Sequence, residues 1–204
     1  MPKVYSIDGI TPVVHPAAFV HPSAVLIGDV IVAARAYIGP SACLRGDFGR
    51  IVVEEGANIQ DTCMLHGFPG KDTVVGAGAT VGHGAVLHGC VVRRGALVGM
   101  NCVVNDNAEV GEDAVVAALA FVKAEARVAP RTLVAGIPAR VLRELTADEL
   151  KWKQDNMRLY QQLAVRSLST MQEVEALTEV EPGRRRFDVP GAIPLSELKK
   201  KRHA

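Results

Sequence analysis

Three histidines, His66, His83 and His88, have the residue type and the spacing that suit a shared metal site. Imidazole is the commonest metal ligand among side chains, and three imidazoles with an open fourth position are typical of a catalytic zinc centre. Fe²⁺ and Co²⁺ also accept imidazole nitrogen. A bound ion lowers the pKa of a water molecule to about 7 and polarises a carbonyl group. The histidines therefore predict hydrolytic metal chemistry, provided that the fold brings them together.

An aliphatic residue recurs every six positions through the segment that contains these histidines. The repeated residues are Val20, Leu26, Val32, Ile38, Leu44, Val53, Ile59, Leu65, Val75, Val81, Leu87, Val98, Val104, Val110, Val116, Val122, Val128 and Val134. Such a repeat is typical of a parallel β-helix, in which three hexads close one triangular coil and each aliphatic points inward. A chain with 49% apolar but only 4% aromatic residues suits this narrow tube. The alternative, a β-sandwich with valine-rich strands, does not hold a constant period for so long.

The phase of the repeat places two of the histidines in one column. The repeat lapses around residues 46–50, which add three residues, and around residues 67–72, which add four. Extra residues in a solenoid are extruded as loops. When these are left out, His66 and His88 are 18 residues apart, and each directly follows an inward leucine. Arg45 has the same phase one coil earlier, so we expect Arg45, His66 and His88 to stack on one face.

His83 has a different phase and lies five residues before His88, on the neighbouring edge of the triangle. The same count aligns His83 with Asp61 and places Gln60 beside it. A prism corner separates His83 from the other two histidines of its own chain, whereas a threefold trimer can bring a neighbour's His83 to each His66/His88 pair. We therefore expect a homotrimer with three metal sites at its subunit interfaces. The alternative is that the histidines are corner residues whose rings satisfy backbone groups.

Several motifs make the chain similar to a known family. They are residues 45–47 (Arg-Gly-Asp), 58–61 (Asn-Ile-Gln-Asp), 66–70 (His-Gly-Phe-Pro-Gly), 82–90 and 98–101. With them the chain resembles the γ-class carbonic anhydrase-like family of left-handed β-helices, and in particular its branch with the phenylacetic acid degradation protein PaaY and the carnitine operon protein CaiE. The resemblance implies a left-handed coil and three histidines that ligate the metal across a trimer interface.

The resemblance also implies roles for other residues. Arg45 and Asp47 match a structural ion pair at the interface, Gln60 a residue that hydrogen-bonds water on the metal, and Asp61 a residue that supports Arg45 and Gln60. The alternatives are a surface position for Asp47 and corner side chains that satisfy backbone groups for Gln60 and Asp61. Asn58 matches a polar residue near the site, although turn chemistry explains an asparagine equally well. A further candidate, from its place on the predicted helix, is Tyr160, which could reach a neighbour's site or simply pack in the core.

The resemblance implies a thioesterase that hydrolyses CoA thioesters of phenylacetate degradation. Arg184, Arg185 and Arg186 could bind the CoA phosphates, because guanidinium groups suit phosphate, or could form a solvated tail. Carbonic anhydrase activity at the same metal is an alternative, but the loop at residues 47–50 is short and lacks an acidic proton-shuttling insertion. Two further alternatives are a hexapeptide acyltransferase, which uses a lone histidine as base without a metal, and a noncatalytic assembly component.

The chain divides into three segments. We expect a β-helix over residues 1–140, a helix within 141–178 that starts at a capping box of Thr146 and Glu149, and a basic, mobile tail over 179–204. The net charge of +1 gives no case for nucleic acid, and the absence of 18 consecutive apolar residues predicts no membrane span. The scattered cysteines and the lack of a secretory signal at the start favour a reducing cytoplasm.

Overall fold

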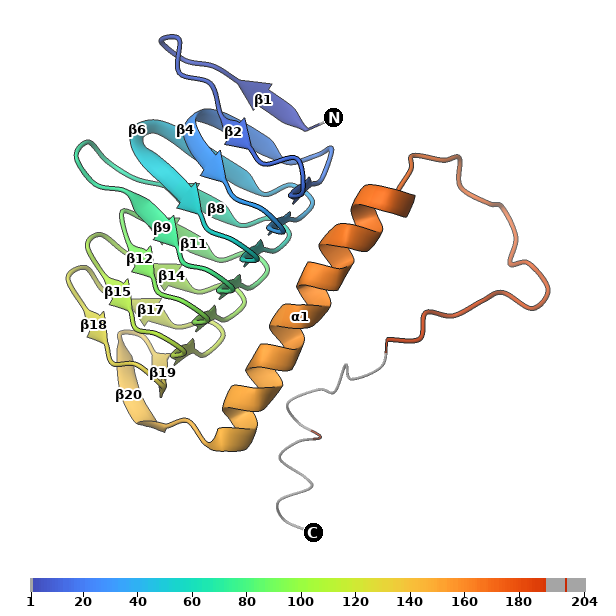
Figure 1. The fold of residues 1–204 in the computed structure, drawn as a ribbon. Coiled ribbons are helices and arrows are strands. Elements are labelled where there is room, and N and C mark those ends of the chain that lie inside the picture. The colour runs from blue at the N-terminus through green and yellow to red at the C-terminus, as the bar shows by residue number, and fades with distance from the viewer. Residues whose placement is uncertain (1, 190–196, 198–204) are drawn as a thin grey trace.

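The computed structural model describes residues 2–189 and residue 197. These residues form a three-sided prism of short, stacked strands, and one long helix, α1 (Ala147–Thr170), runs along its outside (Figure 1). The predicted fold class, an all-β left-handed parallel β-helix with a C-terminal helix packed alongside, is confirmed. The homotrimer stays a prediction.

The strands are parallel and follow one another around the three faces, except that β20 runs antiparallel to β19 at the end of the third face. The first face contains β1 (Lys3–Tyr5), the first halves of β4 (Val25–Val32) and β6 (Cys43–Val53), β8 (Met64–His66), β11 (Val86–His88), β14 (Val103–Val104) and β17 (Phe121–Val122). The second face contains β2 (Val13–Val14), the second halves of β4 and β6, β9 (Thr73–Val75), β12 (Val91–Val92), β15 (Glu109–Val110) and β18 (Arg127–Val128). The third face contains β3 (Phe19–Val20), β5 (Tyr37–Ile38), β7 (Asn58–Ile59), β10 (Thr80–Val81), β13 (Leu97–Val98), β16 (Val115–Val116), β19 (Thr132–Gly136) and β20 (Ala139–Glu144).

The aliphatic repeat forms the core of the prism, as predicted. Leu65 pairs with Leu44 on one side, Leu87 pairs with Leu65 on the other, and all three side chains are fully buried. The structure also supplies a repeat position that the six-residue count had passed over. Val92 lies only five residues after Leu87, is fully buried, and continues the stack of the second face. The count missed it because this coil is one residue short.

Helix α1 is fixed at its start by the predicted capping box. The Thr146 hydroxyl accepts from the Glu149 amide, and the Glu149 carboxylate accepts from the Thr146 amide. Arg143 adds two hydrogen bonds to Glu149, each 2.8 Å long. These contacts hold the pKa of Glu149 at about 2, chiefly through the Arg143 hydrogen bonds, and outweigh the burial that opposes ionisation.

The helix is shorter than the segment predicted for it. Residues 141–144 belong to β20, which pairs with β19 and so takes its hydrogen bonds from the sheet. At the other end the helix stops at Thr170, and Val174 and Leu177 beyond it are exposed. Without a surface to pack against, further turns gain too little to offset the entropy of ordering them.

An aromatic cluster and a buried lysine are among the contacts that hold α1 against the prism. Tyr160 and Ala164 pack on Phe19 and Tyr37 of the third face, and the ring centroids of Tyr37 and Tyr160 are 5.6 Å apart. Lys153, which is 3% exposed, reaches the carbonyl of Gly95 and the carboxylate of Asp113. A buried ammonium group with two oxygen partners fixes the helix at one position along the solenoid.

The predicted tail is only partly described. Residues 179–189 are exposed and contain no helix or strand, whereas 190–196 and 198–204 lie outside the described residues.

The four cysteines are free thiols. Burial raises the pKa of Cys63 to about 11 and of Cys90 to about 12, which makes both thiols unreactive. No helix in the described part of the chain is long and apolar enough to cross a membrane.

Candidate metal centre

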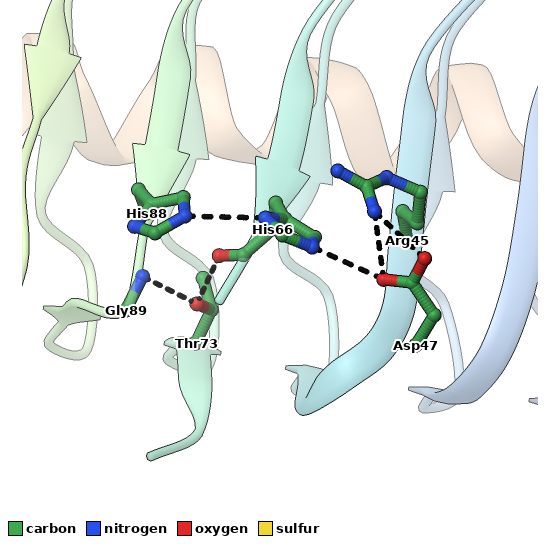
Figure 2. Close-up of polar contacts among 6 residues, drawn as sticks. All are labelled: Arg45, Asp47, His66, Thr73, His88 and Gly89. Carbon is green, nitrogen blue, oxygen red and sulfur yellow. Dashed lines mark hydrogen bonds and ion pairs between the residues drawn. The ribbon is translucent and has the colours of Figure 1, made fainter. Parts of the chain in front are cut away.

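His66 and His88 face one another from adjacent coils, as the repeat predicted. They end β8 and β11 and are direct partners in the strand register. Nδ1 of His66 and Nε2 of His88 are 3.1 Å apart (Figure 2). Arg45 lies in the next coil toward the N-terminus, completing the column, and its guanidinium donates to both oxygens of Asp47 at 2.9 and 2.7 Å.

Each of the three histidines has a carboxylate on one ring nitrogen. Asp47 contacts Nε2 of His66 at 3.0 Å, Asp61 contacts Nδ1 of His83 at 2.9 Å, and Asp106 makes a short contact with Nδ1 of His88. Carboxylates in these positions orient the ring and place its proton on the nitrogen that faces them. The opposite nitrogen of each ring is then left with a lone pair.

Asp47 and Asp106 offer an acceptor for one ring proton of each histidine in the His66/His88 pair. A neutral imidazole carries one N–H. If Asp47 and Asp106 take these N–H groups, the two nitrogens that face one another 3.1 Å apart both carry lone pairs. Two lone pairs repel at this distance unless a metal ion lies against both, or one ring takes up a second proton and donates it to the other. Nitrogens that share a tetrahedral zinc ion are roughly 3.3 Å apart, given Zn–N distances of about 2.05 Å, so the pair fits this group.

Asp47 is held in its ionised form. Burial opposes the charge, but hydrogen bonds from Arg45 and His66 outweigh burial and lower the pKa of Asp47 below its usual value. The predicted Arg45–Asp47 ion pair is therefore present within one chain, and it also supports His66.

Gln60 and Asn58 form a buried amide pair behind His83. Nε2 of Gln60 donates to Oδ1 of Asn58 at 3.2 Å, and Oε1 of Gln60 accepts from the backbone amide of His83 at 3.2 Å. Asn58 in turn donates to the hydroxyl of Thr80 at 2.8 Å. Asp61 contacts His83, and no hydrogen bond joins it to Arg45 or Gln60 among the residues described. The structure thus places Gln60, Asn58 and Asp61 around His83, not around the His66/His88 pair.

The three histidines of one chain do not converge on one point. Within residues 2–189 and residue 197, no group of three or more histidines, cysteines or acidic residues is arranged to hold a metal ion. His83 lies at the corner between the third and first faces, and the His66/His88 pair lies where the first face meets the second. Joining the three imidazoles at one ion requires a second copy of the chain.

Several residues at the site were missed by the sequence analysis. Asp106 contacts His88 although Asn105, and not Asp106, directly follows the inward partner of Leu87 in the next coil. The phase of the repeat did not indicate this contact, because the coil between the two residues is one residue short. Phe48 lies in β6, because residues 46–50, which were predicted to form an extruded loop, continue the strand instead. Phe68 lies in the extruded loop at residues 67–72. The ring centroid of Phe48 is 5.6 Å from that of His66, and the ring centroid of Phe68 is 6.0 Å from that of His88.

Two other predicted groups lie apart from the histidine pair. Tyr160 packs in the aromatic cluster under α1, and burial, with Asp61 nearby, raises the pKa of its phenol to about 12. Arg184 pairs with Glu181 at 2.7 Å, and Arg185 and Arg186 are exposed beside it. No hydrogen bond or ion pair connects these arginines to the histidines in the described part of the chain.

Comparison with known proteins identifies the family. The carnitine operon protein CaiE of Citrobacter koseri is 56% identical over 183 residues, covering 90% of this chain and 93% of that protein. CaiE of Salmonella newport is also 56% identical, covering 90% of this chain and 92% of its own length. This chain belongs to the hexapeptide-repeat family of CaiE. No family model matches it.

Solved structures agree with membership of the hexapeptide-repeat family. A Bacillus cereus protein assigned as an acetyltransferase is 32% identical with a TM-score of 0.81, covering 82% of this chain and 98% of that one. A hexapeptide transferase family protein from Anaplasma phagocytophilum is 36% identical with a TM-score of 0.77, covering 79% and 96%. The predicted likeness to CaiE is confirmed, while the likeness to PaaY and to γ-class carbonic anhydrases stays a prediction.

Proposed function

We propose that this protein is a homotrimeric, metal-dependent thioesterase that hydrolyses acyl-CoA. The observation that carries the proposal is the His66/His88 pair, whose facing nitrogens carry lone pairs if Asp47 and Asp106 hold the ring protons. Zn²⁺ fits the nitrogen donors best, and Fe²⁺ and Co²⁺ fit them as well. His83 of a neighbouring subunit would supply the third ligand, because Asp61 occupies its Nδ1 and leaves Nε2 to face outward.

The outer surface of the first face supports a second copy of the chain as the partner. Its outward side chains form an apolar stripe next to the histidine column, made of Val25, Cys43, Met64, Val86, Val103 and Phe121. Met64 is 50% exposed at the centre of this stripe. An exposed apolar stripe beside an incomplete site is what a closed threefold assembly would cover.

The residues of the chain divide the work of the proposed reaction. The ion, when bound, supplies an activated water and a charge that stabilises the oxyanion. Asp47, Asp61 and Asp106 orient the three imidazoles, and Arg45 keeps Asp47 ionised. Gln60 fixes the backbone of His83 in its own chain, and so sets the position of the imidazole that this chain would offer to the metal site of its neighbour.

The substrate class comes from the motifs and not from the geometry. Resemblance to PaaY implies CoA thioesters of ring-modified phenylacetate intermediates. Arg184, Arg185 and Arg186, which lie on an exposed segment, are suited to the CoA phosphates.

Release of free CoA from phenylacetyl-CoA by the zinc-loaded protein tests the proposal. We expect hydrolysis that disappears on chelation and in His83→Ala, and that Arg93→Ala, at an exposed ion pair with Glu109 on the second face, leaves unchanged. The absence of turnover on a series of acyl-CoA thioesters with the metal fully loaded would contradict it.

Acyl transfer is a second candidate, favoured by the two solved structures named as transferases. It predicts transfer from acetyl-CoA to an amine or hydroxyl acceptor that survives chelation. Carbonic anhydrase activity, the remaining enzymatic alternative, predicts CO₂ hydration in stopped-flow measurements with zinc- or iron-loaded protein. If pathway flux requires the protein but none of these turnovers occurs, a noncatalytic assembly role would replace all three.

A further inference from the structure

Thr73 is a buried polar residue at a position where packing alone would favour an aliphatic one. It begins β9, directly after the extruded loop at residues 67–72, and its exposure is 0%. Its partner in the preceding coil is Ile51, and the partner of Ile51 is Val30. A hydroxyl in this apolar column is costly unless it is hydrogen-bonded. The hydrogen bonds of the Thr73 hydroxyl therefore indicate why a threonine occupies this position.

The Thr73 hydroxyl bridges the two coils that carry His66 and His88. Its Oγ1 donates to the carbonyl oxygen of His66 at 2.7 Å and accepts from the amide of Gly89 at 2.9 Å (Figure 2). The Gly89 amide also donates to the His66 carbonyl at 3.1 Å, so the three groups close a triangle. One corner of this triangle belongs to His66 itself, and another to the residue that follows His88.

We propose that Thr73 is a positioning residue that sets the separation of the His66 and His88 imidazoles. The proposal rests on the proposed metal site and adds a residue that the site needs. The loop at residues 67–72 interrupts the strand register immediately after His66. The backbone hydrogen bonds between strands therefore constrain His66 less than they constrain the same position in a regular coil. The triangle restores the constraint at the point where two ligands must keep a fixed distance.

The chain offers a matched control for this role. Thr132 is also a buried threonine, 7% exposed, and its hydroxyl also donates to a backbone carbonyl, that of Ala129, at 2.7 Å. It lies in β19, near the far end of the solenoid from the histidines. Valine has nearly the shape of threonine without the hydroxyl, so Thr73→Val removes two hydrogen bonds beside the histidines and Thr132→Val removes one away from them.

The test measures zinc affinity of the full-length protein by competition with a chromophoric chelator, and the His66–His88 nitrogen separation in crystals of the metal-free protein. We expect Thr73→Val to weaken zinc binding roughly tenfold, in the range of outer-shell substitutions, and to lengthen the separation. Thr73→Ser, which keeps the hydroxyl, should restore the affinity to within about threefold. Thr132→Val should bind zinc as the unaltered protein does, even though its melting temperature falls.

Two results would overturn the role of Thr73. One is a Thr73→Val protein with unchanged affinity and unchanged nitrogen separation, and the other is an equal loss of affinity in Thr132→Val. If the unaltered protein takes up no zinc, the proposed metal site fails by itself. The nitrogen separation in the crystals of the unaltered protein and Thr73→Val then decides the role of Thr73.

Discussion

The coils that carry the histidines differ from the coils that follow them. From Val92 to Val134 an inward aliphatic occurs at every sixth residue, whereas the earlier coils depart from this spacing three times. Each departure comes after Arg45, His66 or His88, at the corner between the first and second faces. Regular hexads build the scaffold, and the irregular corner frees backbone and side chains for the site.

The largest effect that this comparison predicts is at His88. His88→Ala removes a proposed ligand and should lower zinc affinity by more than about 100-fold, beyond the range of outer-shell changes. Asn105→Ala is the matched change in the next coil, because Asn105 also follows an inward aliphatic, and it should have little effect. Chelator competition on both proteins measures the difference, and equal affinities would remove the distinction between the two regions.

The next effect concerns assembly. Met64→Lys places a charge in the middle of the apolar stripe and should convert the trimer to a monomer, since an unpaired charge is costly at a covered surface. Val91→Lys places the same charge on the second face and should leave the trimer intact. Sedimentation velocity distinguishes the two, and a trimer that tolerates the Met64→Lys change would mean that the first face is not the interface.

A smaller effect is expected at Asp106. Asp106→Asn keeps an acceptor oxygen but removes the negative charge, so the His88 ring is held less firmly and zinc affinity should fall about 10-fold. Asp29→Asn is the control, because Asp29 pairs with Arg50 at 3.0 Å and has no ion pair with His66, His83 or His88. An Asp106→Asn protein that binds zinc as tightly as the unaltered protein would show that the contact between Asp106 and His88 does not support metal binding.

The smallest effect is on stability and lies outside the site. The pKa of Glu149, about 2 in the folded chain, is lower than the ordinary value of 4.5, so its ion pair stabilises the fold above pH 4.5 and is lost as the pH falls toward 2. Glu149→Gln should cost on the order of 1–2 kcal/mol near neutral pH, a figure reduced for the exposure of Arg143. Urea unfolding at pH 7 and at pH 3 should show this difference shrinking with acidity. A difference that is constant with pH would contradict the assignment.

Much of the fold and part of the site could be predicted from spacing alone. The repeat gave the column of Arg45, His66 and His88 and the alignment of His83 with Asp61, because both depend only on the number of residues per coil. The partners of Thr73 and Asp106 could not be found in this way. They depend on how a loop re-enters the sheet and on a coil that is one residue short, and neither follows from a constant period.

The end of the solenoid shows the same limit. The capping box of Thr146 and Glu149 is a local signal and marks the start of the helix correctly. Strand β20 and the stop at Thr170 depend on which surfaces remain to be covered, which is a property of the folded chain.

The central claim, that each site takes His66 and His88 from one subunit and His83 from its neighbour, is tested most directly by mixed trimers. His83→Ala and His88→Ala trimers should each bind no zinc tightly. Trimers purified with both kinds of subunit should regain about one third of the sites, because only one of the three interfaces then joins an intact pair to an intact His83. Mixed trimers that bind no more zinc than the parent variants would contradict the claim.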